Sequence, residues 1–432
     1  MEISTIRILE IQIPNIPFSL MTIFKNLAIA ATALFTLASC SKTQEPQPEP
    51  VSVRMVRSEL VRNADCVNID YNTVLKWNYT HGLLTQSMLL AAEQYPELAS
   101  EVDPYVYHYV DTCIHSDGSI ERYKLTNYTL DHVNAGKMLI MAYKKWPEQR
   151  FRQALDTLYT QLQSHPRVSE GGFWHKKAYP HQMWLDGIYM EAPFYAEYAK
   201  LFLEGEAQQA AYDDVVNQIC VVARHTYDPA NHLYRHAWDE SHEQQWADPT
   251  TGQAPHVWGR ALGWYTMAMV DVLGFLPEDH SGRDSIIAIL QPLCEALLPL
   301  QQPSGAWQQV LDQTGREGNY DETSCTAMFA YTFMKGALLG VLPAEYWQLG
   351  FKAQQGLCLN FIVEDVDDEM QPTGTISLTR VCGVAGLGGN PYRSGDYDYY
   401  INEIIRDNDP KGVGPFIMAS LMAEKHGAQL ED

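Results

Sequence analysis

Residues Trp184 to Phe202 read WLDGIYMEAPFYAEYAKLF, and apolar side chains recur over Leu185–Phe202 at the spacing of a helix. The same spacing recurs in Val74–Glu93, His132–Lys145, Glu148–Leu162, Ala207–Arg224, Val257–Leu276, Ser285–Leu298, Thr323–Leu339, Ala344–Val363 and Gly414–Glu424. Strand-like alternation is rare and short, as in Thr375–Arg380. About a dozen helices of this length predict an all-α fold of helical hairpins, either stacked or closed into a ring.

The composition is that of a globular protein, with 46% hydrophobic and 19% charged residues in 432. No linker-like stretch interrupts residues 57–432, so we expect a single domain there. The formal net charge of -23 argues against a nucleic-acid partner, because phosphates need a basic surface. An anionic substrate would therefore need its own local Arg or Lys.

The N-terminal region predicts an exported bacterial lipoprotein. Residues 21–40 combine a short cationic start, an apolar run and Leu37-Ala38-Ser39-Cys40, which looks like a lipobox with Cys40 as the lipidated residue. Residues 1–20 fit no signal architecture, so we expect translation to start at Met21. Residues 41–56 form a Pro-rich tether, and the lipid would be the only membrane anchor. The absence of acidic residues directly after Cys40 favours a periplasmic face, in the periplasm or at the outer membrane.

No sequence motif predicts a metal or an organic cofactor. The other seven cysteines form no C-x-x-C pair, and most are expected to be small buried side chains. The glycines of Gly383–Gly389 do not match a nucleotide-binding pattern. This stretch and the clusters Ser304–Trp307 and Tyr320–Ser324 are instead expected to be loops that shape a cavity.

Two carboxylates stand at predicted helix starts. Asp186 is flanked by an indole, a phenol, a Leu and a Met, and such apolar bulk favours the protonated form of a carboxyl group. Asp131 precedes another long helical segment in the same way. Either residue could simply cap its helix. Two acids at the mouth of one cavity would instead suit glycosidic chemistry.

Four further residues are candidates for the same site. His236 lies among aromatic and charged residues, and Arg260 and Trp264 share a helix face within Val257–Trp264. Arg260 could be packed against an indole or could bind a substrate carboxylate through two parallel hydrogen bonds. Lys176 is a second cation, with an ordinary surface lysine as the alternative.

Several of these segments occur together in one order along the chain: Trp77-Asn78-Tyr79, Leu130-Asp131, Phe173-Trp174-His175, Gln182–Met190, His236–Asp239, Trp258–Trp264, Gly383–Gly386 and Gly412–Phe416. Together they resemble glycoside hydrolase family 105, the unsaturated rhamnogalacturonyl and glucuronyl hydrolases, from roughly Trp77 to Ser420. Ala261-Leu262 departs from the Gly and polar residue common in that family, which could reshape the pocket beside Arg260. The resemblance implies a six-hairpin (α/α)6 barrel.

The resemblance also implies a substrate and a mechanism. The substrate would be an oligosaccharide left by a polysaccharide lyase, with a 4,5-unsaturated uronic acid at its non-reducing end and, as our first expectation, a pectic rhamnose next to it. Asp186 would protonate C4 and then act as base while water adds to C5, and Asp131 would help hold the proton. Substrate binding would fall to Arg260 and Lys176 at the carboxylate, to Trp184, Trp264 and Tyr79 as stacking rings, and to His236 as a hydrogen-bonding group.

Two other functions are compatible with the same residues. A conventional inverting glycosidase would use Asp131 and Asp186 as separate base and acid, and saturated glycosides would then be substrates. A non-catalytic glycan-binding lipoprotein would use the aromatic residues to stack on sugar without turnover.

Overall fold

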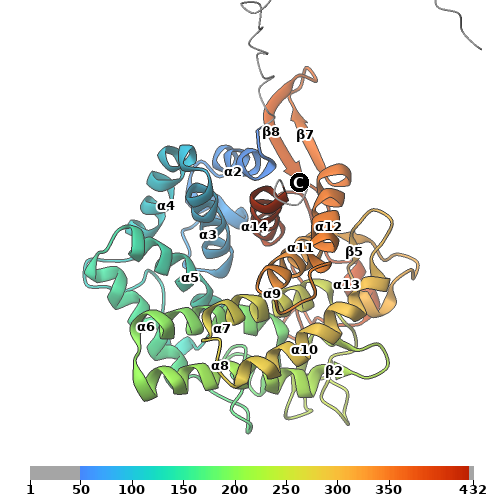
Figure 1. The fold of residues 1–432 in the computed structure, drawn as a ribbon. Coiled ribbons are helices and arrows are strands. Elements are labelled where there is room, and N and C mark those ends of the chain that lie inside the picture. The colour runs from blue at the N-terminus through green and yellow to red at the C-terminus, as the bar shows by residue number, and fades with distance from the viewer. Residues whose placement is uncertain (1–48, 428–432) are drawn as a thin grey trace, which may run out of the picture. The chain divides into compact units, whose positions relative to one another are not determined.

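The computed structural model describes residues 49–427. Six inner helices form a closed ring in which each contacts the next and the last returns to the first (Figure 1): α3 (Tyr79–Gln94), α5 (Leu130–Lys145), α7 (Leu185–Phe202), α9 (Gly259–Phe275), α11 (Thr323–Leu338) and α14 (Pro410–Gly427). Inner helices are buried nearly all round; in α9 every residue from Gly259 to Leu273 is buried. The hairpins are therefore closed into a ring rather than stacked.

Each inner helix packs against one outer helix. The outer helices are α4 (Ala99–Cys113), α6 (Gln149–Ser164), α8 (Gly205–Thr226), α10 (Gly282–Leu297), α12 (Tyr346–Asn360) and α2 (Val51–Arg62). They are buried along one stripe only, as in α6, where Phe151, Leu155, Leu158 and Leu162 recur every three or four residues. The sixth hairpin joins the two ends of the domain, because α2 packs on α14. The fold is the expected (α/α)6 barrel.

The predicted boundary of the Pro-rich tether is wrong. We expected residues 41–56 to be a tether, but α2 begins at Val51, and its Val53, Met55 and Val56 side chains are buried. The domain thus begins at about residue 50, since this helix supplies the outer partner of α14. The predicted start at Met21, the signal segment and Cys40 lie outside the described residues. Within the described part of the chain, no helix combines the length and apolarity needed to cross a membrane.

Two-stranded sheets occur in the connections between the helices. They pair β1 (Gln182–Trp184) with β4 (Ala237–Asp239), β2 (Tyr227–Asp228) with β3 (Leu233–Tyr234), β5 (Trp307–Gln308) with β6 (Asp321–Glu322), β7 (Ile362–Val366) with β8 (Pro372–Leu378), and β9 (Val381–Cys382) with β10 (Ile405–Arg406). A short helix, α13 (Tyr397–Ile401), lies between β9 and β10 in sequence. In the β1–β4 pair, Trp184 lies opposite Ala237, which brings the start of α7 beside His236.

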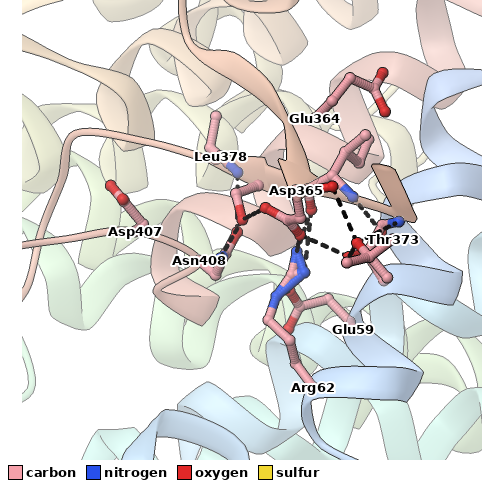
Figure 2. Close-up of polar contacts among 12 residues, drawn as sticks. Glu59, Arg62, Glu364, Asp365, Thr373, Leu378, Asp407 and Asn408 are labelled. Atoms are coloured by element: carbon pink, nitrogen blue, oxygen red, sulfur yellow. Dashed lines mark hydrogen bonds and ion pairs between the residues drawn. The ribbon is translucent and has the colours of Figure 1, made fainter. Parts of the chain in front are cut away.

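The β7–β8 hairpin corrects one predicted helix. We expected a helix over Ala344–Val363, but α12 ends at Asn360 and the chain turns into β7. Arg62 holds the hairpin to α2. Its side chain reaches up to Asp365 (Figure 2). Its guanidinium also donates to the Ile376 carbonyl. The expected strand-like stretch at Thr375–Arg380 overlaps β8.

The seven cysteines of the described residues are all free, and five of them are buried. This agrees with their expected role as small core side chains.

Candidate active site

His236, one of the eight predicted site residues in the described part of the chain, is fully buried and contacts Asp186. The other seven line one hollow. It lies where the inner helices begin, because first-turn residues of five of them line it: Tyr79 of α3, Asp131 of α5, Asp186 of α7, Arg260 of α9 and Lys411 of α14. Helix N-termini carry partial positive charge, which favours carboxylates at this end of the barrel. A larger hollow at the opposite ends of α3, α11 and α14 contains none of the predicted site residues.

Neither aspartate caps its helix. The N-cap positions of α5 and α7 are Thr129 and Trp184, so Asp131 and Asp186 each occupy the second helical residue. The capping alternative is therefore wrong for both, and their carboxylates are free to make tertiary contacts.

Asp131 is held as a carboxylate. Its Oδ2 lies 2.5 Å from Nζ of Lys176, and its Oδ1 lies 3.6 Å from Nε2 of His175. Burial is the largest single effect and raises the pKa of Asp131, but the Lys176 charge and hydrogen bond together with His175 and His132 outweigh it, and the pKa ends below the ordinary value. Burial lowers the pKa of His175 to about 4, so this imidazole is neutral near pH 7. Lys176 is thus a site residue rather than a surface lysine.

Asp186 has a different neighbour. Its Oδ2 lies 3.1 Å from Nε2 of His236, although no donor in the described part of the chain is aligned with this buried oxygen for a hydrogen bond. On the other side of the ring, Nδ1 of His236 lies 2.7 Å from the Tyr400 hydroxyl. Burial raises the pKa of Tyr400 well above its usual value, so it is a neutral phenol. If this phenol donates to Nδ1, the ring proton lies on Nε2, facing Asp186.

Aromatic rings form the walls of the hollow. Trp184 lies parallel to Tyr179 at 5.1 Å and to His175 at 4.8 Å between centroids. Trp264 stacks on Tyr189 at 4.7 Å. Each predicted stacking indole therefore already has a ring partner within the protein, which fixes its orientation toward the hollow.

Arg260 makes the packed contact that was one of its two predicted roles. Its guanidinium lies 4.9 Å from the Trp258 ring and donates to the carbonyls of Cys382 (2.7 Å) and Gly383 (3.2 Å). It is 1% exposed but still borders the hollow. Arg260 thereby anchors the segment Gly383–Gly389, hereafter the glycine loop.

The glycine loop shapes the hollow as expected, since Val384 and Ala385 line it. The other predicted loops, Ser304–Trp307 and Tyr320–Ser324, do not reach it. Instead, the second of these segments supports the glycine loop, because the Glu322 carboxylate accepts hydrogen bonds from the Ser324 hydroxyl and from the amide of Cys382, the residue before that loop.

Sequence reasoning missed several residues that line the hollow, notably Tyr179, Arg393 and Lys411. The one available signal for Arg393 was its position a few residues after the glycine loop. Lys411 gave no signal, because its Nζ is paired with Asp70 at 3.0 Å and Asp409 at 2.8 Å, contacts that depend on the closed barrel.

An (α/α)6 barrel with two carboxylates, a neutral histidine and aromatic walls at one mouth is the architecture of a glycoside hydrolase. Residues 51–426 match the model of Glycosyl Hydrolase Family 88. A family 105 glycoside hydrolase from C. acetobutylicum ATCC 824 is 39% identical, with a TM-score of 0.80 over 87% of this chain and 100% of that one. The chain therefore belongs to the glycoside hydrolase family 88/105 group, and it is an enzyme.

Two further relatives are more distant. The unsaturated rhamnogalacturonyl hydrolase YesR of Bacillus subtilis is 26% identical over 237 residues, which cover 52% of this chain and 62% of that protein. The unsaturated glucuronyl hydrolase of Bacillus sp. GL1 is 12% identical, with a TM-score of 0.60 over 87% of this chain and 95% of that one, and shows the shared fold.

Proposed function

We propose that this enzyme removes a 4,5-unsaturated uronic acid from the non-reducing end of lyase-generated oligosaccharides by hydrating the C4=C5 bond. The observation that carries the proposal is the contrast between two carboxylates in one hollow. Asp131 is paired with Lys176, whereas the buried oxygen of Asp186 has no aligned donor and lies beside His236. One carboxylate is paired with a cation and the other is not, so the second is our candidate for the group that transfers the proton.

In the proposed reaction, Asp186 gives a proton to C4, and positive charge develops at C5 beside the ring oxygen. A water molecule then adds to C5 and returns a proton to Asp186. The C5 hemiketal opens to a ketone, which leaves a C1 hemiacetal that expels the adjoining sugar. The net change is the addition of water, and one carboxyl group serves first as acid and then as base.

Neighbouring residues support this division of roles. A proton on Nε2 of His236 would stabilise Asp186 whenever it is ionised, and Tyr400 holds the ring from behind. Trp184, Trp264 and Tyr79 border the space in which the unsaturated ring would lie.

The sugar next to the uronate is proposed to be rhamnose of pectic origin. The support is the relative from Bacillus subtilis, whose name describes a rhamnogalacturonyl hydrolase.

The test is to incubate the protein with unsaturated rhamnogalacturonan disaccharide and to follow the near-ultraviolet absorbance of the conjugated double bond. We expect wild type to consume the absorbance and Asp186→Asn to lose at least about 1,000-fold in kcat, as expected for removal of the group that transfers the proton. Asp368→Asn, an exposed carboxylate on the β7–β8 connection, is the matched control and should behave as wild type.

The same assay separates the proposal from a conventional inverting glycosidase. Saturated disaccharides of the same sugars should not be hydrolysed, because protonation at C4 requires the double bond. Turnover of saturated substrates, or absorbance that persists with wild type on pectic, glycosaminoglycan and ulvan-derived fragments, would overturn the proposal.

A further inference from the structure

Four cationic side chains line the hollow, and their partners differ. Lys176 is paired with Asp131, and Lys411 with Asp70 and Asp409. Arg260 is 1% exposed and committed to the carbonyls of the glycine loop. Only Arg393 is both partly exposed and held by neutral groups. Among residues 49–427, no carboxylate lies within ion-pair distance of its guanidinium.

The Arg393 guanidinium is fixed in place by three acceptors. Its Nε donates to the Gly388 carbonyl at 2.8 Å, and its Nη2 donates to the Leu387 carbonyl at 3.0 Å and the Tyr179 hydroxyl at 3.2 Å. Its Nη1 donates to no group of the described residues and is not enclosed by protein. One N–H-bearing edge of an oriented cation is therefore available at the border of the hollow.

The glycine loop is built around this side chain. A Cβ at Gly386 would overlap Nη1 of Arg393, and one at Gly389 would come within 3.1 Å of Nη2. Backbone hydrogen bonds in both directions between Gly388 and Arg393 close the turn that returns the arginine to the loop. The close approach requires glycine, which is a reason for this composition beyond turn formation.

The positive charge around Arg393 indicates what kind of ligand the hollow would bind. Arg393 is close enough to Lys176 to oppose its protonation, so two cations lie near each other on this wall of the hollow. This pair of cations contrasts with the formal net charge of the chain, which is -23. A guanidinium edge over a water-accessible hollow suits an oxyanion.

We propose that Arg393 binds an oxyanion of the substrate and sets the preference of the enzyme for charged oligosaccharides. The proposal rests on the proposed function. The oxyanion is either the carboxylate of the unsaturated ring or a sulfate or carboxylate on the adjoining sugar. Lys176 then serves chiefly to hold Asp131, and Arg393 supplies the charge that recognises the substrate.

The experiment measures kcat/KM on three disaccharides: the unsaturated uronyl-rhamnose, its methyl ester and its sulfated form. Arg393→Gln removes the charge. Gly386→Ala keeps the charge but displaces Nη1, the far end of a flexible side chain, so the fold should tolerate it. Arg122→Gln, an exposed arginine paired with its neighbour Glu121, is the matched control.

If the ring carboxylate is the ligand, Arg393→Gln and Gly386→Ala should lower kcat/KM on the free acid by about 10- to 100-fold and leave the ester nearly unchanged. If the anion lies on the adjoining sugar, the variants should instead abolish the preference for the sulfated form and keep the ratio of acid to ester. Either result supports the proposal. Calorimetric binding of acid and ester to Asp186→Asn, with and without Arg393→Gln, should give the same ratios without turnover.

Equal losses on charged and uncharged substrates, or no loss with either variant while Arg122→Gln matches wild type, would overturn the proposal. Circular dichroism and thermal unfolding identify a variant that has not folded, and Gly386→Ala then carries the test. Failure of the proposed function would look different, because wild type itself would leave the absorbance of every disaccharide unchanged.

Discussion

Glu59 on α2 makes the stability of the barrel depend on pH. Its side chain is fully buried, with Oε2 accepting from Asn63 at 2.9 Å and Oε1 lying 3.4 Å from Nε of Arg62 (Figure 2). Burial raises its pKa from 4.5 to about 7, with Arg62 and Asn63 opposing the rise and Asp409 and Asp365 adding to it. The native state therefore binds this proton more tightly than the unfolded chain.

The sign and size of the effect follow from linkage. Because the native pKa is raised, the stabilisation from the bound proton is complete below about pH 4.5 and is lost as the pH rises through about 7. At roughly 1.4 kcal/mol per pKa unit, the interval from 4.5 to about 7 corresponds to about 3 kcal/mol. Glu59→Gln stays neutral at every pH, so it should gain up to about 3 kcal/mol relative to wild type across this window.

Urea unfolding at several pH values, followed by tryptophan fluorescence and by circular dichroism, measures the difference between the two proteins. Coincident transitions in the two signals justify a free-energy comparison. Glu369→Gln, an exposed glutamate on the β7–β8 connection, should follow wild type at every pH. A constant difference between Glu59→Gln and wild type, or one that shrinks with rising pH, would refute the reasoning.

Two further predictions concern the site. Lys176→Met should lower kcat/KM by at least about tenfold and move the acidic limb of the pH–rate profile upward, because the effect of burial on the Asp131 pKa is then opposed by the neighbouring histidines alone. Lys177→Met, its exposed neighbour, is the control, and an unmoved acidic limb would contradict the assignment. Tyr400→Phe should lower kcat about tenfold with little change in KM, since it removes the hydroxyl 2.7 Å from Nδ1 of His236. Tyr392→Phe, at an exposed tyrosine, is the control, and an equal loss of kcat in the two variants would contradict the prediction.

The inner helices were predictable from local pattern. Leu185–Phe202 was predicted with the observed bounds of α7, and Thr323–Leu339 differs from α11 by one residue, because inner helices are apolar on most faces. The first outer helix, α2, was missed because it directly follows Pro-rich sequence, and α4 was missed because it carries Pro104, a residue that usually interrupts a helix. The end of α12 was missed because Ile362 and Val363 are apolar in strand and helix alike.

The site residues that lie within short sequence motifs could be predicted. Asp131, Asp186 and Arg260 line one hollow, as their motifs suggested. His236 is fully buried and lies against Asp186, so its predicted hydrogen bond to the sugar is replaced by a contact with that carboxylate. Arg393 and Lys411 were not predictable, since their importance depends on which other charges face them, and those partners come from distant segments.

The sequence alone thus determined the helical hairpins, the carboxylates at helix starts and the family. The tertiary structure decided that the hairpins close, with α14 meeting α2, and that the starts of the inner helices share one mouth. It also decided which cation pairs with which acid: Lys176 with Asp131, and Lys411 with Asp70 and Asp409. Within residues 49–427, Arg393 forms no ion pair with a carboxylate. The physical reason is the distance along the chain between the residues that interact. Helix formation depends on residues three or four apart, whereas charge pairing and burial at the mouth depend on contacts between segments that only the closed ring brings together.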